Sequence, residues 1–393
     1  MGRRFDRVLL LVLDGVGLGA LPDAAAYGDE GSDSLGHVAR AVGGLEVPHL
    51  ARRGLGRIAH LPRWADCAVT GAYGRLFMAA AGKDSTSGHW ELAGLVLQKS
   101  FPLFPEGFPA EAVAALESAT SCKFLGNRAA SGTEIIAELG AEHLRTGALI
   151  LYTSADSVCQ IAAHVDLLPP EELCRCGARA RGAMTGPYAV GRVIVRPFEG
   201  TPGAFRRIDG GRRDFALPPP APTLLDRLAE AGYAVRGIGK VDQIFAGRGF
   251  TSAVPTRDNA DGIAKIREAL RKEEAGLIFA NLNDFDTAFG HRNDVEGYAQ
   301  ALEQFDAALP ELESETAEVD LVLIVSDHGN DPTTPSTDHS RECTPLLAWH
   351  RRLEREVPLG TRGTFADVGQ TIADNFDAGP LDAGASFLNA ILV

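Results

Sequence analysis

The chain has few of the features that mark secreted or zinc-stabilised proteins. Its 393 residues include only six cysteines, and they are scattered. They are Cys67, Cys122, Cys159, Cys174, Cys176 and Cys343. Cys174 and Cys176 are separated by a single residue, which is not the spacing of a zinc knuckle or of a thioredoxin motif. We therefore expect free thiols in a reducing compartment and predict a cytoplasmic protein.

The sequence also lacks an apolar run of the roughly 20 residues that a membrane-spanning helix requires. The basic N-terminus followed by Val8–Leu13 superficially resembles a signal peptide. Asp14 interrupts this run, and no small-residue cleavage site follows it. The segment is therefore interpreted as a buried strand, and no membrane association is expected.

Positive charge is scarce as well, with 38 Lys and Arg against 52 Asp and Glu and a net charge of −14. Such a chain is repelled by nucleic acid and by anionic lipid, so we expect neither as a partner. An anionic substrate would need cations placed locally. No feature indicates a protein partner. The length and the 45% hydrophobic content allow two domains, or one large domain with an insertion.

Four short apolar runs share one feature, an aspartate at or just beyond the carboxyl end. They are Val8–Leu13 before Asp14, Leu149–Thr153 before Asp156, Leu277–Leu282 before Asp284 and Asp286, and Leu321–Val325 before Asp327. Their lack of alternation is typical of parallel strands buried on both faces. Helical stretches at 222–231 and 261–272 predict an α/β fold with helices on both faces of the sheet. Ligands of such folds bind beyond the carboxyl ends of the strands, although some of these aspartates could instead cap helices.

Aspartates and histidines from three of these strand ends make up one set of candidate metal ligands. The set consists of Asp14, Asp286, His291, Asp327, His328 and His339. One Asp-His pair in a loop is usually an ordinary polar turn, but carboxylates and imidazoles together suit zinc, manganese or iron. Six such ligands are enough for two metal ions. A paired-metal centre clamps phosphoryl oxygens and stabilises charge on both the entering and the leaving group.

Three consecutive hydroxyls, Ser85, Thr86 and Ser87, precede an expected helix within the segment Gly82–Leu92. A hydroxyl at a helix N-terminus meets free backbone N–H groups, which favour a bound phosphoryl group. Metal coordination would activate that hydroxyl as a nucleophile. Simple N-capping by a Ser or Thr is the competing interpretation, and it does not exclude the first.

Taken together, these segments resemble the phosphopentomutase family of the alkaline phosphatase superfamily over essentially the whole chain. The most specific motif is Gly-Lys-Asp-Ser-Thr-Ser-Gly-His-Trp-Glu at 82–91, whereas an Asp-His pair marks only the superfamily. Other matching segments are Gly28–His37, Phe104–Pro109, Thr153–Ser157, Gly191–Phe198, Asp284–His291, Asp327–Asp331, Thr337–His339 and Thr364–Asp367. The resemblance implies an alkaline-phosphatase-like core with a mainly parallel sheet flanked by helices, and an inserted smaller α+β cap domain.

The resemblance also implies an isomerase that interconverts ribose 1-phosphate, or 2-deoxyribose 1-phosphate, with the 5-phosphate in nucleoside salvage. It implies two Mn²⁺ ions, in place of which other divalent ions could serve, and a sugar bisphosphate activator such as ribose 1,5-bisphosphate or glucose 1,6-bisphosphate. By position, Asp14, Ser85, Asp327 and His328 would surround one ion, and Asp286, His291 and His339 the other. The family typically carries threonine at the position of Ser85. Serine offers the same hydroxyl chemistry, so a phosphoserine at Ser85 is predicted. Thr86 is the alternative site of phosphorylation.

The stretch 101–216 separates the two parts of the expected catalytic core, 1–100 and 217–393. Prolines at Phe101–Pro105 and Leu217–Pro222 suggest hinge-like connections, so an inserted cap domain is predicted. Six arginines lie close in its sequence at 192, 196, 206, 207, 212 and 213, of which about half are expected only to pair with acids or face solvent. By match to the family, Arg192, Arg207 and Lys240 are expected to contact phosphate, and Ser154 and Asp156 are expected to meet sugar hydroxyls. Ser131–Glu134 is interpreted as a capping box that opens a helix, which is a structural role.

Two rival activities use similar metals. A phosphatase or phosphodiesterase would share the nucleophile and then admit water. A phosphoglycerate mutase of the same superfamily has similar metal ligands but a different nucleophile motif and insert. A purely structural metal site fits poorly, because such sites have closed coordination and no adjacent hydroxyl cluster.

Overall fold

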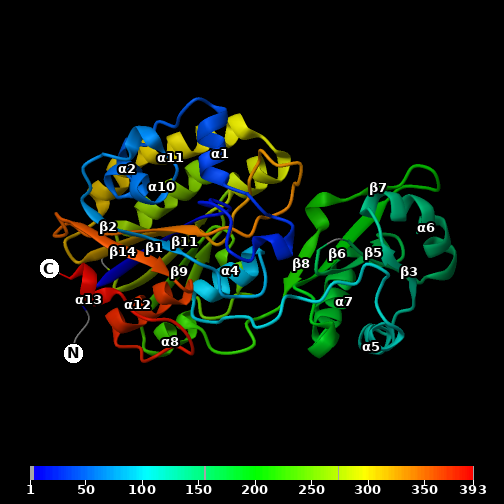
Figure 1. Cartoon of the computed structure of the whole chain (residues 1–393). Helices are drawn as coiled ribbons and strands as arrows, with labels where there is room; N and C mark the ends of the chain where they lie inside the picture. Colours follow the sequence, from blue (N-terminus) through cyan, green and yellow to red (C-terminus); the bar gives the residue numbers. More distant parts are fainter. Residues whose placement is uncertain (1–3, 155, 273, 393) are drawn as a thin grey trace. The chain divides into compact units, whose positions relative to one another are not determined.

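The computed structural model describes residues 4–154, 156–272 and 274–392, which divide into two compact units. The larger unit comprises Met1–Ser100 and Pro219–Val393, and the smaller unit is Phe101–Pro218. The chain therefore leaves the larger unit once and returns to it, as its colours show in Figure 1. The insert predicted from the sequence, 101–216, ends two residues earlier than the smaller unit.

An eight-stranded sheet forms the centre of the larger unit. Its order is β10 (Ser252–Val254), β9 (Ala234–Ile238), β11 (Gly276–Leu282), β1 (Arg7–Leu13), β12 (Asp320–Val325), β13 (Thr344–Trp349), β2 (Gly71–Leu76) and β14 (Glu356–Arg362). In this sheet β13 runs antiparallel to both of its neighbours, and the other pairs are parallel. Every residue of β1, β11 and β12 is buried. The predicted mainly parallel sheet with continuous apolar strands is confirmed.

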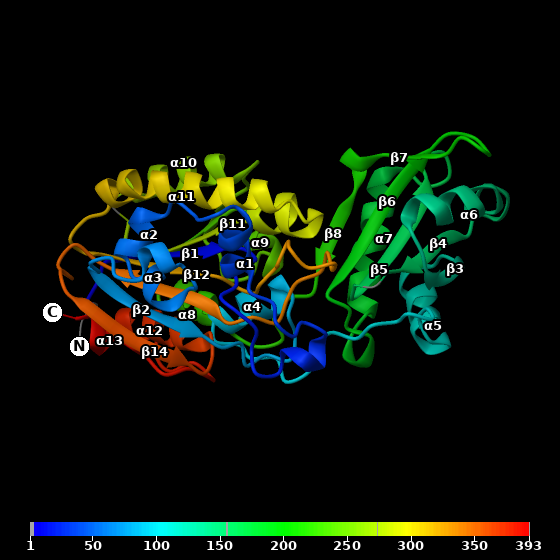
Figure 2. The ribbon, with the colours of Figure 1, turned by 45° about the horizontal axis from the view of Figure 1, so that its top comes forward.

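Helices cover both faces of this sheet (Figures 1 and 2). One layer contains α1 (Ser34–Ala41), α2 (Pro48–Arg52), α10 (Asn259–Leu270) and α11 (Val295–Glu315), and the other contains α4 (Ser85–Leu92), α8 (Leu224–Glu230), α12 (Ala366–Phe376) and α13 (Leu388–Ile391). The remaining α-helices of this unit are α3 (Leu55–Ile58) and α9 (Val241–Ile244). In α11 the buried Leu302, Phe305, Leu309 and Leu312 recur every three or four residues, so one face of that helix packs inward. The predicted helices at 222–231 and 261–272 correspond to α8 and α10.

The register of the central strands positions the functional residues. Leu13 of β1 pairs with Leu282 of β11, and Val12 pairs with Val325 of β12. The residues that follow these three strands therefore leave the sheet at one edge. This is the carboxyl edge at which ligands of parallel α/β folds bind.

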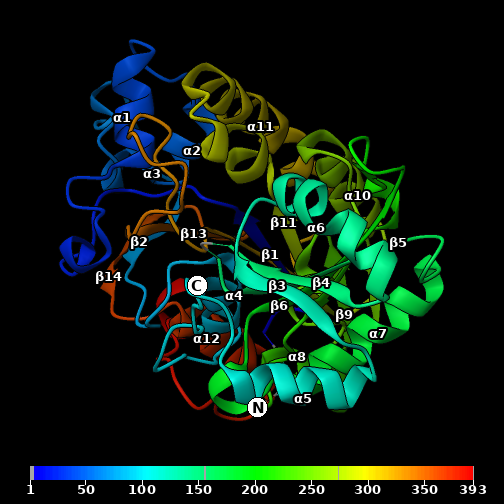
Figure 3. The ribbon, with the colours of Figure 1, turned by 90° about the vertical axis from the view of Figure 1, so that its right-hand side faces the viewer.

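The smaller unit is a second layered domain, seen from the front in Figure 3. Its sheet order is β3 (Phe124–Ala129), β4 (Leu149–Thr153), β5 (Val158–His164), β6 (Arg192–Glu199) and β7 (Arg206–Arg207), with β8 (Arg213–Ala216) also paired to β6. Leu149 and Leu151 of β4 share a core with residues of α5 (Ala110–Thr120) and α7 (Pro170–Ala183). Ile150 and Tyr152 pack instead with residues of α6 (Gly132–Thr146). Because successive strand side chains point to opposite faces, helices lie on both sides of this sheet as well.

Two local expectations were wrong. Leu149–Thr153, which the sequence pattern groups with the three core strands, belongs to the smaller sheet, so Asp156 does not lie at the carboxyl edge of the larger one. α6 does start after Ser131, but the Ser131 side chain makes no cap hydrogen bond, so the expected capping box is not formed.

Two further features concern the expectations about thiols and membranes. All six cysteines are free thiols in this structure. Among the described residues, no helix combines the length and the apolar character needed to traverse a lipid bilayer.

Candidate metal centre and nucleophile

The first group of candidate metal ligands consists of Asp14, Asp327 and His328, and all three side chains are buried. Asp14 directly follows β1, and the other two follow β12. His328 Nε2 lies 3.3 Å from Asp14 Oδ1 and 3.3 Å from Asp327 Oδ2. One ligand atom from each residue falls within 4.8 Å of the others, which is compact enough to surround one ion.

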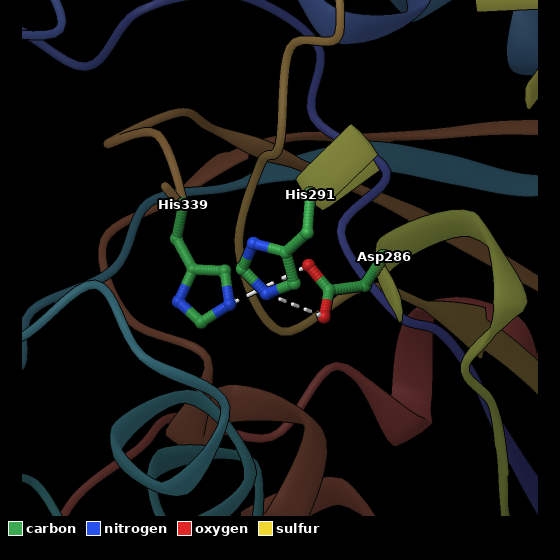
Figure 4. A group of neighbouring side chains, drawn as sticks. All are labelled: Asp286, His291 and His339. Atoms are coloured by element: carbon green, nitrogen blue, oxygen red, sulfur yellow. Dashed lines mark ion pairs between the residues drawn. The ribbon is translucent and has the colours of Figure 1, made fainter. Parts of the chain in front are cut away.

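The second group consists of Asp286, His291 and His339, which converge in Figure 4. His291 Nε2 lies 3.2 Å from Asp286 Oδ2, and His339 Nε2 lies 3.4 Å from Asp286 Oδ1. Asp286 occupies a π-helical turn, η5 (Phe285–Phe289), directly beyond the end of β11. Such turns are frequent at functional sites. The ring centroids of His328 and His339 are 3.9 Å apart, so the two groups adjoin.

Hydrogen bonding leaves both groups with acceptor atoms that lack a partner. Asp14 Oδ1, Asp327 Oδ2 and His339 Nε2 are buried without a hydrogen-bond partner among the described residues. Burial raises the pKa of Asp14, and the charge of Asp327 raises it further. A divalent cation would supply what these atoms lack, and the mixed oxygen and nitrogen donors suit manganese, zinc or iron.

The histidine tautomers fit a bound cation as well. His328 Nδ1 lies 3.1 Å from the Gly329 carbonyl oxygen, and His291 Nδ1 lies 2.6 Å from that of Thr337. Since a carbonyl only accepts, each Nδ1 donates its proton, and in the neutral ring Nε2 then presents a lone pair to the carboxylates. This is the arrangement in which metal-binding histidines are held by a second hydrogen bond.

Ser85 is the hydroxyl that faces the first group. It is the first residue of α4, and its Oγ lies 3.0 Å from His328 Nε2. The helix is capped by Asp84, whose carboxylate accepts hydrogen bonds from Ser87 N at 3.0 Å and from Ser87 Oγ at 2.6 Å. The expectation that a Ser or Thr caps this helix was therefore wrong. An aspartate cap leaves the Ser85 hydroxyl available for chemistry.

Buried charged side chains hold the segment before Ser85 in place. Glu91 accepts hydrogen bonds from the backbone nitrogens of Ala79 and Ala80, and also from Thr364 Oγ1. Arg341 donates to the carbonyl oxygens of Ala80 and Gly82. These contacts tie the loop and the start of α4 to distant parts of the larger unit, so Ser85 is held on a rigid support.

Comparison with known proteins shows which family the chain belongs to. A family model described as the metalloenzyme superfamily matches residues 6–380. The phosphopentomutase of Carboxydothermus hydrogenoformans is 52% identical over 386 residues, which cover 98% of this chain and 99% of that protein. The phosphopentomutase of Thermotoga maritima is 52% identical over 389 residues, with 98% and 99% covered.

The chain belongs to the phosphopentomutase family. The solved structure of the PH0037 protein from Pyrococcus horikoshii matches with a TM-score of 0.50 and 15% identity, covering 98% of this chain and 100% of that one. At that identity the likeness supports the fold alone. A metalloenzyme core of α/β architecture, flanked by helices on both faces, is thus confirmed.

Asn330 lies in one of the candidate metal-site segments, and the sequence assigned it no role. Asn330 Nδ2 donates a hydrogen bond to Asp286 Oδ1 at 2.7 Å, and Asn330 N donates to Ser34 Oγ at 3.1 Å. Through the first of these bonds Asn330 orients the carboxylate of Asp286, a candidate metal ligand. In the sequence, the position of Asn330 inside the Asp-His-Gly-Asn-Asp motif was the feature that could have indicated this role. Asp338, by contrast, lies 3.4 Å from Lys83 Nζ and belongs to neither group.

The predicted substrate-binding residues are divided between the two units. Lys240 precedes α9 in the larger unit and is exposed, whereas the other four belong to the smaller unit. Ser154 is half-buried and Asp156 exposed, and Ala155 between them lies outside the described residues. The side chains of Arg192 and Arg207 are exposed.

The six arginines of the smaller unit differ in how firmly they are paired. Arg206 and Arg212 bind Glu199 and Asp214 at 2.9 and 2.6 Å. Arg196 donates to Gln160 at 2.9 Å. Arg192 and Arg207 have acidic neighbours at the longer distances of 3.8 and 3.9 Å, and Arg213 donates to the carbonyl oxygens of Gly210 and Arg212. Arg192, Arg207 and Arg213 are therefore less firmly paired with acids than Arg206 and Arg212.

Proposed function

We propose that this chain catalyses the phosphopentomutase reaction, in which a phosphoryl group moves between C1 and C5 of ribose or 2-deoxyribose. The observation that carries the proposal is the Ser85 hydroxyl, 3.0 Å from His328 Nε2, beside two adjoining groups of metal ligands. The family relationship at 52% identity over nearly the whole chain identifies the reaction.

We assign the first metal position to Asp14, Asp327, His328 and Ser85, and the second to Asp286, His291 and His339. Two Mn²⁺ ions, or other divalent ions in their place, would neutralise the nonbridging phosphoryl oxygens and favour the alkoxide of the nucleophile. Ser85 is the nucleophile, and the free N–H groups at the start of α4 face the phosphoryl group that it carries. The Asp84 cap leaves the Ser85 hydroxyl available for this role.

The reaction cycle consists of two transfers. Phosphoserine 85 donates its phosphoryl group to the free hydroxyl of a pentose monophosphate: the Ser85 Oγ–P bond breaks, a new O–P bond forms on the sugar, and the proton of the sugar hydroxyl passes to the Ser85 Oγ that is released. The resulting bisphosphate reorients and returns its other phosphoryl group to Ser85. A sugar bisphosphate, such as ribose 1,5-bisphosphate or glucose 1,6-bisphosphate, supplies the first phosphoryl group.

The smaller unit acts in this proposal as a cap that excludes water, since water would hydrolyse the phosphoenzyme. Arg192, Arg207 and Lys240 bind the phosphate that is not being transferred. Ser154 and Asp156 bind sugar hydroxyls. The loose pairing of Arg192 and Arg207 supports their part in this assignment.

Phosphorus NMR tests the proposal directly. The protein is incubated with Mn²⁺, ribose 1-phosphate and a trace of glucose 1,6-bisphosphate. Conversion to ribose 5-phosphate is expected, and Ser85→Ala should show none. Release of inorganic phosphate as the main product would instead identify a phosphatase and overturn the proposal.

A further inference from the structure

Behind the first metal position, four buried side chains form a continuous series of hydrogen bonds and close polar contacts. Asn281 Nδ2 lies 2.9 Å from Asp14 Oδ2 and 3.1 Å from His89 Nε2. His89 Nδ1 lies 3.0 Å from Asp327 Oδ2 and 2.9 Å from the Ser85 carbonyl oxygen. Asn281 and His89 are both fully buried. They link the two carboxylates of the first position to each other and to the helix that carries the nucleophile.

The direction of every hydrogen bond in this series follows from its chemistry. Asp14 Oδ2 is a carboxylate oxygen, so the amide nitrogen of Asn281, not its oxygen, must face it. The second hydrogen on that amide nitrogen then points at His89 Nε2, which must accept. In the neutral ring the proton therefore sits on Nδ1, which donates to the Ser85 carbonyl oxygen at 2.9 Å and lies 3.0 Å from Asp327 Oδ2. His89 thus faces Asp327 with a donor and Asn281 with an acceptor.

Fold stability does not explain this placement. Asn281 interrupts the otherwise apolar strand β11, and its Oδ1 is buried without a hydrogen-bond partner among the described residues. An unsatisfied buried polar atom costs about 1–3 kcal/mol, so an apolar residue would serve the strand better. The presence of an amide at this position is explained by the two N–H donors that it offers to Asp14 and His89. Phe279, two residues earlier, stacks on the His89 ring at 5.7 Å and holds its orientation.

We propose that His89 and Asn281 are positioning residues that act as one unit, orienting Asp14 and Asp327 and thereby setting the affinity of the first metal position. The inference rests on the proposed two-metal site. Neither residue belongs to the two groups of ligand side chains. Their effect is transmitted through the two carboxylates and through the start of α4.

Metal affinity of the folded protein tests this inference without any activity measurement. The protein is freed of metal with a chelator and titrated with Mn²⁺, and free Mn²⁺ is read from its EPR signal. His89→Phe and Asn281→Leu are each expected to weaken one of two Mn²⁺ sites by about 10–100-fold, the usual cost of removing a ligand's hydrogen-bond partner. His89→Asn retains a donor near the position of Nδ1, so its affinity should lie between that of His89→Phe and that of the wild type. Because the two residues are proposed to act as one unit, the double variant should bind Mn²⁺ no more weakly than the weaker-binding of the two single variants.

A matched control separates positioning from general damage to the fold. His350 is another buried histidine of the larger unit, and its ring contacts the Ile391 carbonyl at 2.8 Å, outside both ligand groups. His350→Phe should lower the melting temperature and leave Mn²⁺ affinity unchanged. The thermal melt of each variant, recorded without metal, shows which ones fold.

The outcomes are distinguishable. A wild-type protein that binds no Mn²⁺ would refute the two-metal site itself. A wild-type protein that binds two ions, with folded His89→Phe and Asn281→Leu matching its affinities, would refute the positioning role alone. Equal losses in His350→Phe, or fully additive losses in the double variant, would also overturn it.

Discussion

Ser85 Oγ and His328 Nε2 lie 3.0 Å apart although 243 positions separate them in the sequence. The contact exists because α4 begins at Ser85 and the segment carrying His328 leaves β12 at the same edge of the sheet. Ser87 is held by the Asp84 cap, which leaves Ser85 as the hydroxyl that contacts a candidate metal ligand within the described residues.

This contact predicts which hydroxyl is phosphorylated. Ser85→Ala should lower kcat by about a thousandfold or more, as expected for removal of a nucleophile, whereas Thr86→Val should retain most of the activity. Phosphopeptide mapping after incubation with glucose 1,6-bisphosphate should locate the phosphate on Ser85. Its recovery on Thr86 would refute the assignment.

Metal binding should stabilise the fold measurably. A ligand at a hundred times its Kd contributes about 2.7 kcal/mol, so Mn²⁺ should raise the melting temperature of the chelator-treated protein. Asp286→Asn should reduce the stoichiometry from two ions to one. Asp284→Asn is the matched control, since Asp284 also follows β11 but accepts a hydrogen bond from Asn259 N at 2.7 Å, in neither ligand group. Retention of two ions by Asp286→Asn would contradict the proposed ligand set.

The arginines of the smaller unit should differ in their effect on catalysis. A charge-assisted hydrogen bond contributes about 1.5–3 kcal/mol, so Arg207→Ala should raise KM roughly ten- to hundredfold. Arg206→Ala is the control, because Arg206 already binds Glu199 at 2.9 Å. Steady-state kinetics with ribose 1-phosphate compares the two variants, and equal KM values would argue against a phosphate-binding role for Arg207.

The stability of the smaller unit should fall as the pH drops. His143 is buried, its Nδ1 donates to the Ala148 carbonyl at 2.7 Å, and its Nε2 accepts from His164 N at 2.8 Å. Burial lowers the pKa of His143 below its ordinary value, so the unfolded chain binds this proton more readily than the folded one. The contribution of His143 is therefore complete above its unfolded pKa, near 6.5, and declines below it by at most about 1.4 kcal/mol per pH unit.

Hydrogen exchange of the α6 amides, followed by mass spectrometry between pH 7.5 and 5.5, reports this loss after correction for the intrinsic pH dependence of exchange. His143→Gln should be less stable at pH 7.5 and should show a smaller pH dependence. An unchanged pH dependence in that variant would assign the effect to other groups.

Several features could be read from the sequence because they depend on local chemistry. A short unbroken apolar run such as Val8–Leu13 is typical of a buried strand, and an aspartate that closely follows it lies near the strand's end. Asp14, Asp286 and Asp327 were found in this way. His291, His328 and His339 were found because they lie close in sequence to aspartates that follow these strands. Family resemblance then supplied the reaction, which no periodicity could have indicated.

Other features depended on contacts between distant segments. Leu149–Thr153 has the same pattern as the core strands, and only its pairing with β3 and β5 places it in the smaller sheet. Asp84, not a neighbouring hydroxyl, caps α4, because both kinds of side chain can serve and three-dimensional fit selects between them. The roles of Asn330, Asn281 and His89 were hidden for the same reason.

The sequence by itself determined the strands of the core, the ligand types and the family, since these follow from residue chemistry and order. The family resemblance already implied how the ligands divide between two ions and that Ser85 is the nucleophile. Tertiary structure alone showed that Asp84 caps α4 and that Ser85 Oγ lies 3.0 Å from His328 Nε2. It also revealed the series of polar contacts through Asn281 and His89 next to Asp14 and Asp327. Hydrogen bonds and ion pairs are directional and act over about 3 Å, so their partners are set by how the folded strands and loops meet.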